Sequence, residues 1–135
     1  MAPTIKPGEM IQIDYTAYML ATPKRWDVVA FEPLASTNAL YCMRVVGLPS
    51  ESVGFASGGI SVNGQPLALP LYLSNVHYVS LDHPALHYAG AGVANPYIVP
   101  RDCYFVLGDN PTNANDSRFW GAIPKTNIVG KVRGK

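Results

Sequence analysis

Polar and apolar residues alternate over residues 11–15 of the chain, and a period of two is typical of a β-strand with one buried face. Further along, short runs rich in β-branched and aromatic residues end at Pro or Gly, which predicts more strands. The predicted strands are residues 11–15, 26–31, 40–46, 60–62, 104–107 and 128–132. Asn63 and Gly64 directly follow the run 60–62, and they favour the type I′ turn of a β-hairpin because both accept positive φ angles.

Residues 66–97 show no sustained period. They contain all the histidines and several Pro and Gly residues, so we expect irregular hairpins and loops there. The 12 Gly and 12 Pro of the chain favour many short strands over long helices. At 135 residues the chain is long enough for one domain with its own core. We therefore predict a single, mainly β domain over residues 1–135. Its antiparallel sheets come from residues 1–64 and 97–135, with an irregular insertion at about 65–96.

The composition narrows the classes of partner. Charged residues make up 14% of the chain, against about 25% in typical globular domains. Because the formal net charge is only +1, we predict no nucleic-acid partner. The shortage of charge leaves apolar surface that would suit a partner, an extended peptide or a nearby bilayer. No apolar run reaches the roughly 20 residues of a membrane span, and no signal-peptide pattern is present, so we expect the chain as given to be soluble.

The two cysteines, Cys42 and Cys103, both lie in apolar runs that are predicted to be strands. A free cysteine packs as a small apolar side chain, so buried thiols are the favoured interpretation. A disulfide stays possible if the two strands are neighbours.

The histidines are the other candidates for metal ligands. His83 and His87, beside Asp82, would share one face only on a helix, and Pro84 disfavours a helix there. His77 adds a nitrogen but no convincing geometry. We therefore predict no metal ligands and no cofactor.

A loop of short polar side chains lies between the predicted strand 104–107 and the aromatic pair at 119–120. Such side chains bond nearby backbone groups and hold a loop in one shape. They are Asp109, Asn110, Asn113, Asn115, Asp116 and Ser117. Arg118 is the natural counter-ion for Asp116 or Asp109. The loop is predicted to be fixed, either to support a site or simply to tie down the chain.

The same loop resembles the last signature segment of the type I signal peptidases, a family of Ser-Lys endopeptidases. Residues 108–110 read Gly-Asp-Asn, residues 116–118 read Asp-Ser-Arg, and residues 119–121 read Phe-Trp-Gly. Three further segments resemble the family's motifs in the expected order, namely residues 1–9, 25–31 and 41–51. The resemblance implies a partly closed, barrel-like fold of the signal-peptidase/LexA type. It also implies a location on the extracytoplasmic face of a membrane, held there by a segment outside this chain.

Three positions depart from the family's catalytic pattern. In these enzymes a serine hydroxyl attacks the scissile carbonyl, and a lysine amine, kept neutral by burial, takes its proton. The serine would immediately precede Met1, so it is not in the sequence as given, and the lysine position is occupied by Met43. A serine that supports this lysine corresponds to Ala114. The resemblance therefore predicts a domain that is inactive as given. The alternatives are an active peptidase whose serine lies upstream and whose base is unusual, and a relative of the self-cleaving repressors.

The resemblance also assigns a groove for an extended peptide or signal-sequence-like segment, bound by β-addition. Its edges would be Met1, Pro3, Ile5, Tyr41, Cys42 and Met43. The residues that support the walls of the site would be Asp109, Asn110, Asp116, Ser117 and Arg118.

Overall fold

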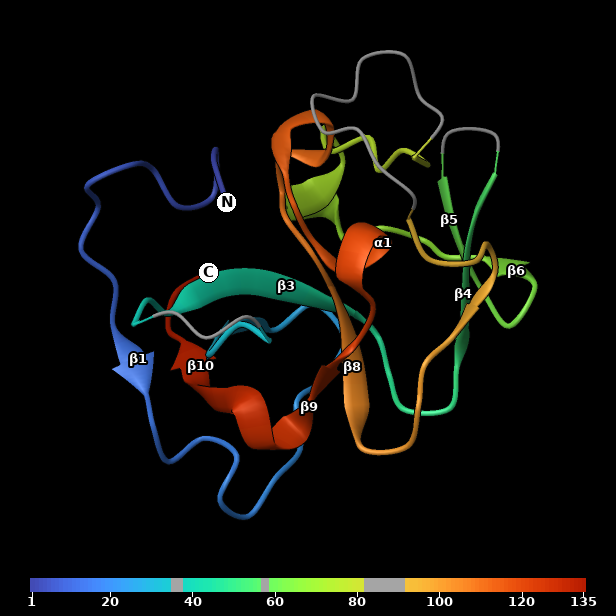
Figure 1. Ribbon diagram of the computed structural model, residues 1–135. Coiled ribbons are helices and arrows are strands. Elements are labelled where there is room, and N and C mark those ends of the chain that lie inside the picture. The colour runs from blue at the N-terminus through green and yellow to red at the C-terminus, as the bar shows by residue number, and fades with distance from the viewer. Residues whose placement is uncertain (35–37, 57–58, 82–91) are drawn as a thin grey trace.

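The computed structural model describes residues 1–34, 38–56, 59–81 and 92–135. The described chain forms two antiparallel sheets, which lie side by side in Figure 1. The six-stranded sheet has the order β1 (Ile13–Asp14), β10 (Ile128–Val132), β2 (Val28–Phe31), β3 (Tyr41–Gly47), β8 (Cys103–Leu107) and β9 (Ile123–Pro124). The four-stranded sheet has the order β6 (Gln65–Pro66), β5 (Gly59–Val62), β4 (Ser52–Ala56) and β7 (Tyr97–Ile98).

Among the described residues, helical structure is limited to single turns. They are the 3-10 turns η1 (Leu71–Leu73), η2 (Pro111–Asn113) and η3 (Lys125–Asn127), and the α-helix α1 (Ser117–Trp120). The prediction of a mainly β, antiparallel fold is confirmed. The strands of the described residues form two separate sheets and no closed barrel, in line with the expectation of a fold that is only partly closed.

Each strand predicted from the sequence is present, with shifts at its ends. The predicted hairpin turn is also present, since Asn63 and Gly64 have φ angles of 52° and 80°. The Asn63 side chain fixes this turn further by accepting a hydrogen bond from the Ser52 N–H at 2.9 Å. The strands β4, β7 and β9 were missed. In β4, Gly54 breaks the apolar pattern, and it is needed because a Cβ there would lie 2.8 Å from the Ser61 hydroxyl.

The core surrounds the middle strands of the larger sheet. All four residues of β2 are fully buried. In β8 the side chains alternate between two clusters: Tyr104 and Val106 join one, and Phe105 and Leu107 join the other. This strand is therefore buried on both faces, and the loop that follows it starts from a rigid base.

The described parts of the expected insertion are mostly irregular, as predicted, but they also supply core residues. Leu73, Tyr78 and Val79 are buried, and Tyr78 packs in the same cluster as Phe105 and Leu107. The segment thus holds the sheet as well as connecting its strands.

The cysteines are free, and both are half-buried. Cys42 lies beyond the end of the β3–β8 ladder at Leu107, whereas Cys103 lies at the opposite end of β8, so neighbouring strands do not bring the thiols together. Burial raises the pKa of both thiols.

His77 is exposed, while Asp82, His83, Pro84 and His87 lie outside the described residues. Within the described ranges, no three His, Cys, Asp or Glu side chains form a group that could hold a metal ion. Nor does this part of the chain contain a helix of the length and apolarity that crossing a membrane requires.

Candidate functional site

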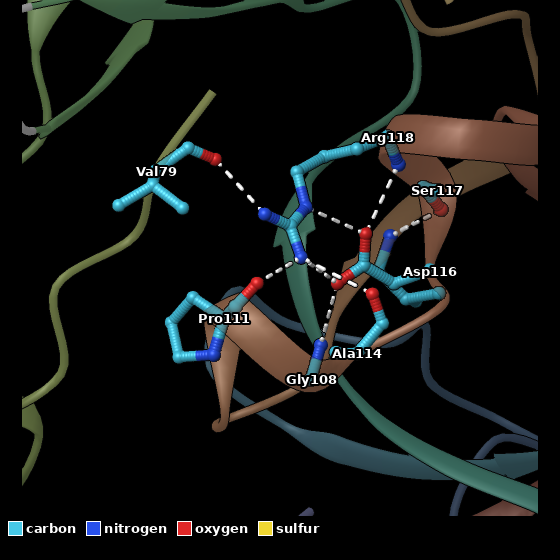
Figure 2. Close-up of polar contacts among 8 residues, drawn as sticks. Val79, Gly108, Pro111, Ala114, Asp116, Ser117 and Arg118 are labelled. Atoms are coloured by element: carbon cyan, nitrogen blue, oxygen red, sulfur yellow. Dashed lines mark hydrogen bonds and ion pairs between the residues drawn. The ribbon is translucent and has the colours of Figure 1, made fainter. Parts of the chain in front are cut away.

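The polar loop after β8 is organised around Asp116, which pairs with Arg118 (Figure 2). Arg118 Nε lies 2.8 Å from Oδ1 of Asp116, and Nη2 lies 3.0 Å from Oδ2. The backbone N–H groups of Gly108 and Arg118 donate to the same carboxylate at 3.2 and 3.1 Å. Both side chains are buried. Burial raises the pKa of the Asp116 carboxyl, and the Arg118 guanidinium and the two N–H groups oppose this effect.

The remaining donors of Arg118 bind one carbonyl group of another segment and one of the loop itself. Nη1 donates to the Val79 carbonyl at 2.9 Å, and Nη2 donates to the Pro111 carbonyl at 2.6 Å. The Ser117 hydroxyl accepts a hydrogen bond from the Val106 N–H of β8 at 2.9 Å. The fixed shape expected from the sequence is therefore observed, and Asp116 is the partner of Arg118.

Asp109 has a different and more distant partner, Arg44 on β3. Arg44 Nε and Nη2 lie 2.9 and 2.7 Å from the two carboxylate oxygens. The Tyr78 hydroxyl donates to Oδ1 at 3.2 Å, and the Thr4 hydroxyl donates to Oδ2. The side chains of this ion pair are 1% and 0% exposed. Four separate segments of the chain thus meet at one buried carboxylate.

Arg44 is held on its other side as well. Nη1 donates to the Trp26 carbonyl at 2.8 Å, and the ring centroid of Tyr72 lies 5.6 Å from the guanidinium carbon. Burial opposes the charge of Arg44, but the hydrogen bonds and negative charge of Asp109 outweigh it and raise the pKa of the guanidinium. Sequence reasoning missed this arginine as a site residue, although a charged residue inside a strand with apolar neighbours is itself a sign of a buried partner.

A cleft of about 470 Å³ lies between the start of the chain, the start of β3 and the polar loop. Its described lining is Met1, Ala2, Ile5, Lys6, Pro7, Leu40, Cys42, Met43, Gly108, Asn110, Asn113, Ala114 and Asn115. The two departures inside the chain, Met43 and Ala114, therefore line the same cleft. Of the predicted groove edges, Met1, Ile5 and Cys42 line it too.

Two predicted groove residues lie elsewhere. Pro3 lines a neighbouring hollow together with Thr4 and Tyr72. Tyr41 is exposed and packs edge-to-face against Phe31, with ring centroids 6.0 Å apart. Asn110 lines the cleft and precedes η2, but its side chain makes no capping hydrogen bond to that turn.

Met43 and Ala114 fit closely into their surroundings. Met43 lies opposite Val29 of β2 and packs, half-buried, against the cluster that contains Val29. The loop approaches the end of β8 so closely that a Cβ on Gly108 would lie 2.6 Å from the Ala114 Cβ. Both positions are thus filled by apolar groups in contact with the frame of the site.

The start of β3 has an open edge beside the cleft. Residues 41–44 all pair with β2, whereas the pairing with β8 begins only at Arg44, which lies opposite Leu107. Within the described chain, no strand pairs with the second edge of residues 41–43. An extended segment could add to this edge through its backbone.

The lining offers little acid–base chemistry. Among its described residues there is no histidine, carboxylate or hydroxyl group. The Cys42 thiol has a pKa raised by burial, which disfavours the reactive thiolate. Lys6 supplies an amine, but its side chain is exposed, and a lysine base requires burial.

Comparison with known proteins identifies the kind of domain to which this fold and this cleft belong. A family model described as "Signal peptidase, peptidase S26" matches residues 1–135, so the chain belongs to the signal peptidase family. The crystal structure of a signal peptidase I from Enterococcus faecalis V583 superimposes with a TM-score of 0.62 and 30% identity. That match covers 82% of this chain and 96% of the other.

Similar sequences from other organisms support the same family. The chain is 33% identical to signal peptidase I of Leptolyngbya laminosa over 139 residues, which is 98% of this chain and 62% of that protein. It is 32% identical to the probable signal peptidase I-2 of Synechocystis sp. over 137 residues, 98% of this chain and 56% of that protein. The chain thus spans little more than half the length of these two relatives.

Proposed function

We propose that this signal peptidase-like domain binds extended peptides without cleaving them. The observation that carries the proposal is that Met43 and Ala114 line one cleft. These residues occupy the positions at which the resemblance would place the lysine base and its supporting serine. A thioether cannot accept a proton, and a hydroxyl beside it would lack a partner.

The frame around the cleft supports binding. The ion pairs of Asp109 with Arg44 and of Asp116 with Arg118 hold the polar loop against β3 and β8. The open edge of residues 41–43 offers backbone groups to an added strand, and the apolar lining offers room for its side chains. The proposed ligand is a signal-sequence-like segment. The proposed location is the extracytoplasmic face of a membrane, where a segment outside residues 1–135 would anchor the domain.

The loss of catalysis is tested on the full-length protein as its gene encodes it. We expect no cleavage of an extended substrate that carries small residues before the cut. A variant with serine immediately before Met1, Met43→Lys and Ala114→Ser should gain cleavage, because it restores nucleophile, base and support together. The same variant with Met43→Leu in place of the lysine is the matched control and should stay inactive.

One outcome would contradict the proposal of inactivity, and a second would contradict the cause that we assign to it. Cleavage by the unaltered full-length protein, abolished when a serine upstream of Met1 is changed to alanine, would establish the active alternative. A well-folded triple variant without activity would show that other positions also disable the site.

Binding is tested separately by nuclear magnetic resonance. An extended peptide should shift the backbone amides of residues 41–43 as it pairs with their open edge, with smaller changes in β9. A peptide of the same composition with proline at alternate positions is the control, because it cannot donate those backbone hydrogen bonds. If the extended peptide leaves residues 41–43 unshifted, the binding proposal is wrong.

A further inference from the structure

Charge is distributed unevenly in the lining of the cleft. Among the described lining residues, Lys6 is the one charged side chain. Most of the others are apolar, and three are the amide residues Asn110, Asn113 and Asn115, whose NH₂ groups are hydrogen-bond donors. The cleft therefore combines an apolar surface with one charged side chain and neutral donors.

Lys6 forms no direct ion pair with the described residues, although its charge contributes to the lowered pKa of the Glu9 carboxyl. In the described part of the chain, no carboxylate lies within ion-pairing distance of its ammonium group, although six other basic residues each have one. Glu9 is the nearest candidate, and it accepts the backbone N–H of Lys6 at 2.8 Å. Its other oxygen is taken by Lys135 Nζ at 2.5 Å, and Glu9 is not part of the lining.

From this composition we infer that the cleft prefers peptides with a free C-terminal carboxylate, with Lys6 as the counter-ion. The inference rests on the proposed peptide-binding function and specifies its ligand. An apolar peptide end carries one negative charge on its carboxylate, which is complementary to the Lys6 ammonium and to the amide donors. An internal peptide segment has no such charge and leaves Lys6 unpaired. The ligand class is then a peptide that has already been cut, such as the product of a separate endopeptidase.

The test compares two forms of one peptide on the full-length protein. An eight-residue peptide of small apolar residues ending in alanine is prepared as the free acid and as the C-terminal amide. Dissociation constants come from calorimetry, and the amide shifts of residues 41–43 confirm the site. We expect the acid to bind about 5- to 10-fold more tightly at low salt, since hydrogen bonds to charged groups contribute more than neutral ones. High salt should reduce this preference.

Variants of Lys6 assign the effect. Lys6→Gln should bind acid and amide equally, and Lys6→Glu should prefer the amide. Lys24→Gln removes an exposed lysine that is not in the lining, so it should keep the full preference of the unaltered protein. Each variant can be checked for folding by the shifts of residues remote from the cleft.

The outcomes separate the inference from the function on which it rests. If both peptides bind equally to the unaltered protein, peptide binding stands and the carboxylate preference is wrong. A preference that persists in Lys6→Gln also overturns the assignment. If neither peptide binds the cleft, the proposed function fails and the inference fails with it.

Discussion

The polar loop of residues 108–118 and the cleft beside it differ in the side chains that they contain: the loop buries charged groups, whereas the cleft is lined mostly by apolar ones. In the loop, the carboxylates of Asp109 and Asp116 are fully buried, and each meets a guanidinium and further hydrogen-bond donors. In the cleft, the positions of the expected lysine and its partner hold a thioether and a methyl group, Met43 and Ala114. A buried charge is stable only when its partners are present. The ion pairs of the loop are complete without any group at positions 43 and 114, so these two positions can change while the frame of the site is kept.

The largest effect is expected from breaking the loop's inner ion pair with Asp116→Asn. The substitution keeps the volume but leaves the buried guanidinium of Arg118 without a negative partner. We expect the free energy of unfolding to fall by about 3–5 kcal/mol, measured by urea denaturation at pH 7. Asp102→Asn, at an exposed turn, is the control and should change it by less than about 0.5 kcal/mol. A loss below about 1 kcal/mol for Asp116→Asn would show that the loop is not the rigid frame described above.

The second prediction concerns the cleft. Met43→Lys places an amine against the apolar cluster that holds Val29, and burial should lower the pKa of that amine. We expect a loss of about 2–3 kcal/mol at pH 7, equivalent to a shift of about two pKa units. Because the folded state disfavours the protonated form, this loss should shrink as the pH rises toward 10.

Two further variants sharpen this prediction. Adding Ala114→Ser should recover about 1 kcal/mol through one hydrogen bond to the amine. Met43→Leu should cost less than about 1.5 kcal/mol and show no such pH dependence. If the lysine and leucine variants have the same stability across this pH range, position 43 is not desolvated and the comparison between loop and cleft is wrong.

What the sequence predicted correctly in this region is local. The sequence indicated Asp116 or Asp109 as the partner of Arg118, and the observed partner is Asp116, which is only two residues away. The strands were found because their apolar runs are continuous, and the Asn63–Gly64 turn because few residues accept its φ angles. The family was recognised because four segments resemble its motifs and occur in the expected order, which is stronger evidence than any single residue.

What the sequence could not predict depends on contacts between distant segments. Arg44 and Asp109 are 65 residues apart, and Tyr78 belongs to a segment without any periodic pattern. Trp26 has a φ angle of 76°, a conformation that is unusual for a bulky residue and that no local signal indicates. The contact between Arg44 and Asp109 and the φ angle of Trp26 both depend on tertiary packing, which cannot be read directly from a single sequence.

The third prediction tests the link between the loop and the cleft, which is the hydrogen bond from Thr4 to Asp109. Thr4→Val keeps the shape but removes the donor, so the carboxylate loses one partner. We expect a loss of about 1 kcal/mol in stability and changed amide shifts over residues 1–5, of which Met1, Ala2 and Ile5 line the cleft. Thr4→Ser should restore both. If Thr4→Ser disturbs residues 1–5 as much as Thr4→Val, packing of the methyl group and not the hydrogen bond holds these residues.

The smallest effect is expected at an ion pair outside the loop, between Arg25 and Glu51. Two bonds of 2.8 Å join the side chains, which are 22% and 16% exposed, so water screens this pair more than the pairs in the loop. Partial burial acts to raise the pKa of the Glu51 carboxyl, but the hydrogen bonds from Arg25 and the Leu48 N–H prevail and lower it.

A carboxyl with a lowered pKa stabilises the fold above its unfolded value of about 4.3, and this contribution is lost as the pH falls through the folded value. Glu51→Gln should therefore cost about 0.5–1 kcal/mol at pH 7 and nothing near pH 3, measured by urea denaturation at both pH values. The Gln carbonyl can still accept the hydrogen bonds from Arg25 Nη1 and the Leu48 N–H, but its NH₂ group cannot accept the one from Arg25 Nη2. A protonated Glu51 carboxyl likewise keeps only one oxygen free of a proton, so the change in cost between the two pH values reports the charge. If Glu51→Gln lowers the free energy of unfolding as much as Asp116→Asn does, burial does not distinguish the two ion pairs. The ion pair in the loop would then stabilise the fold no more than an ordinary, partly exposed pair.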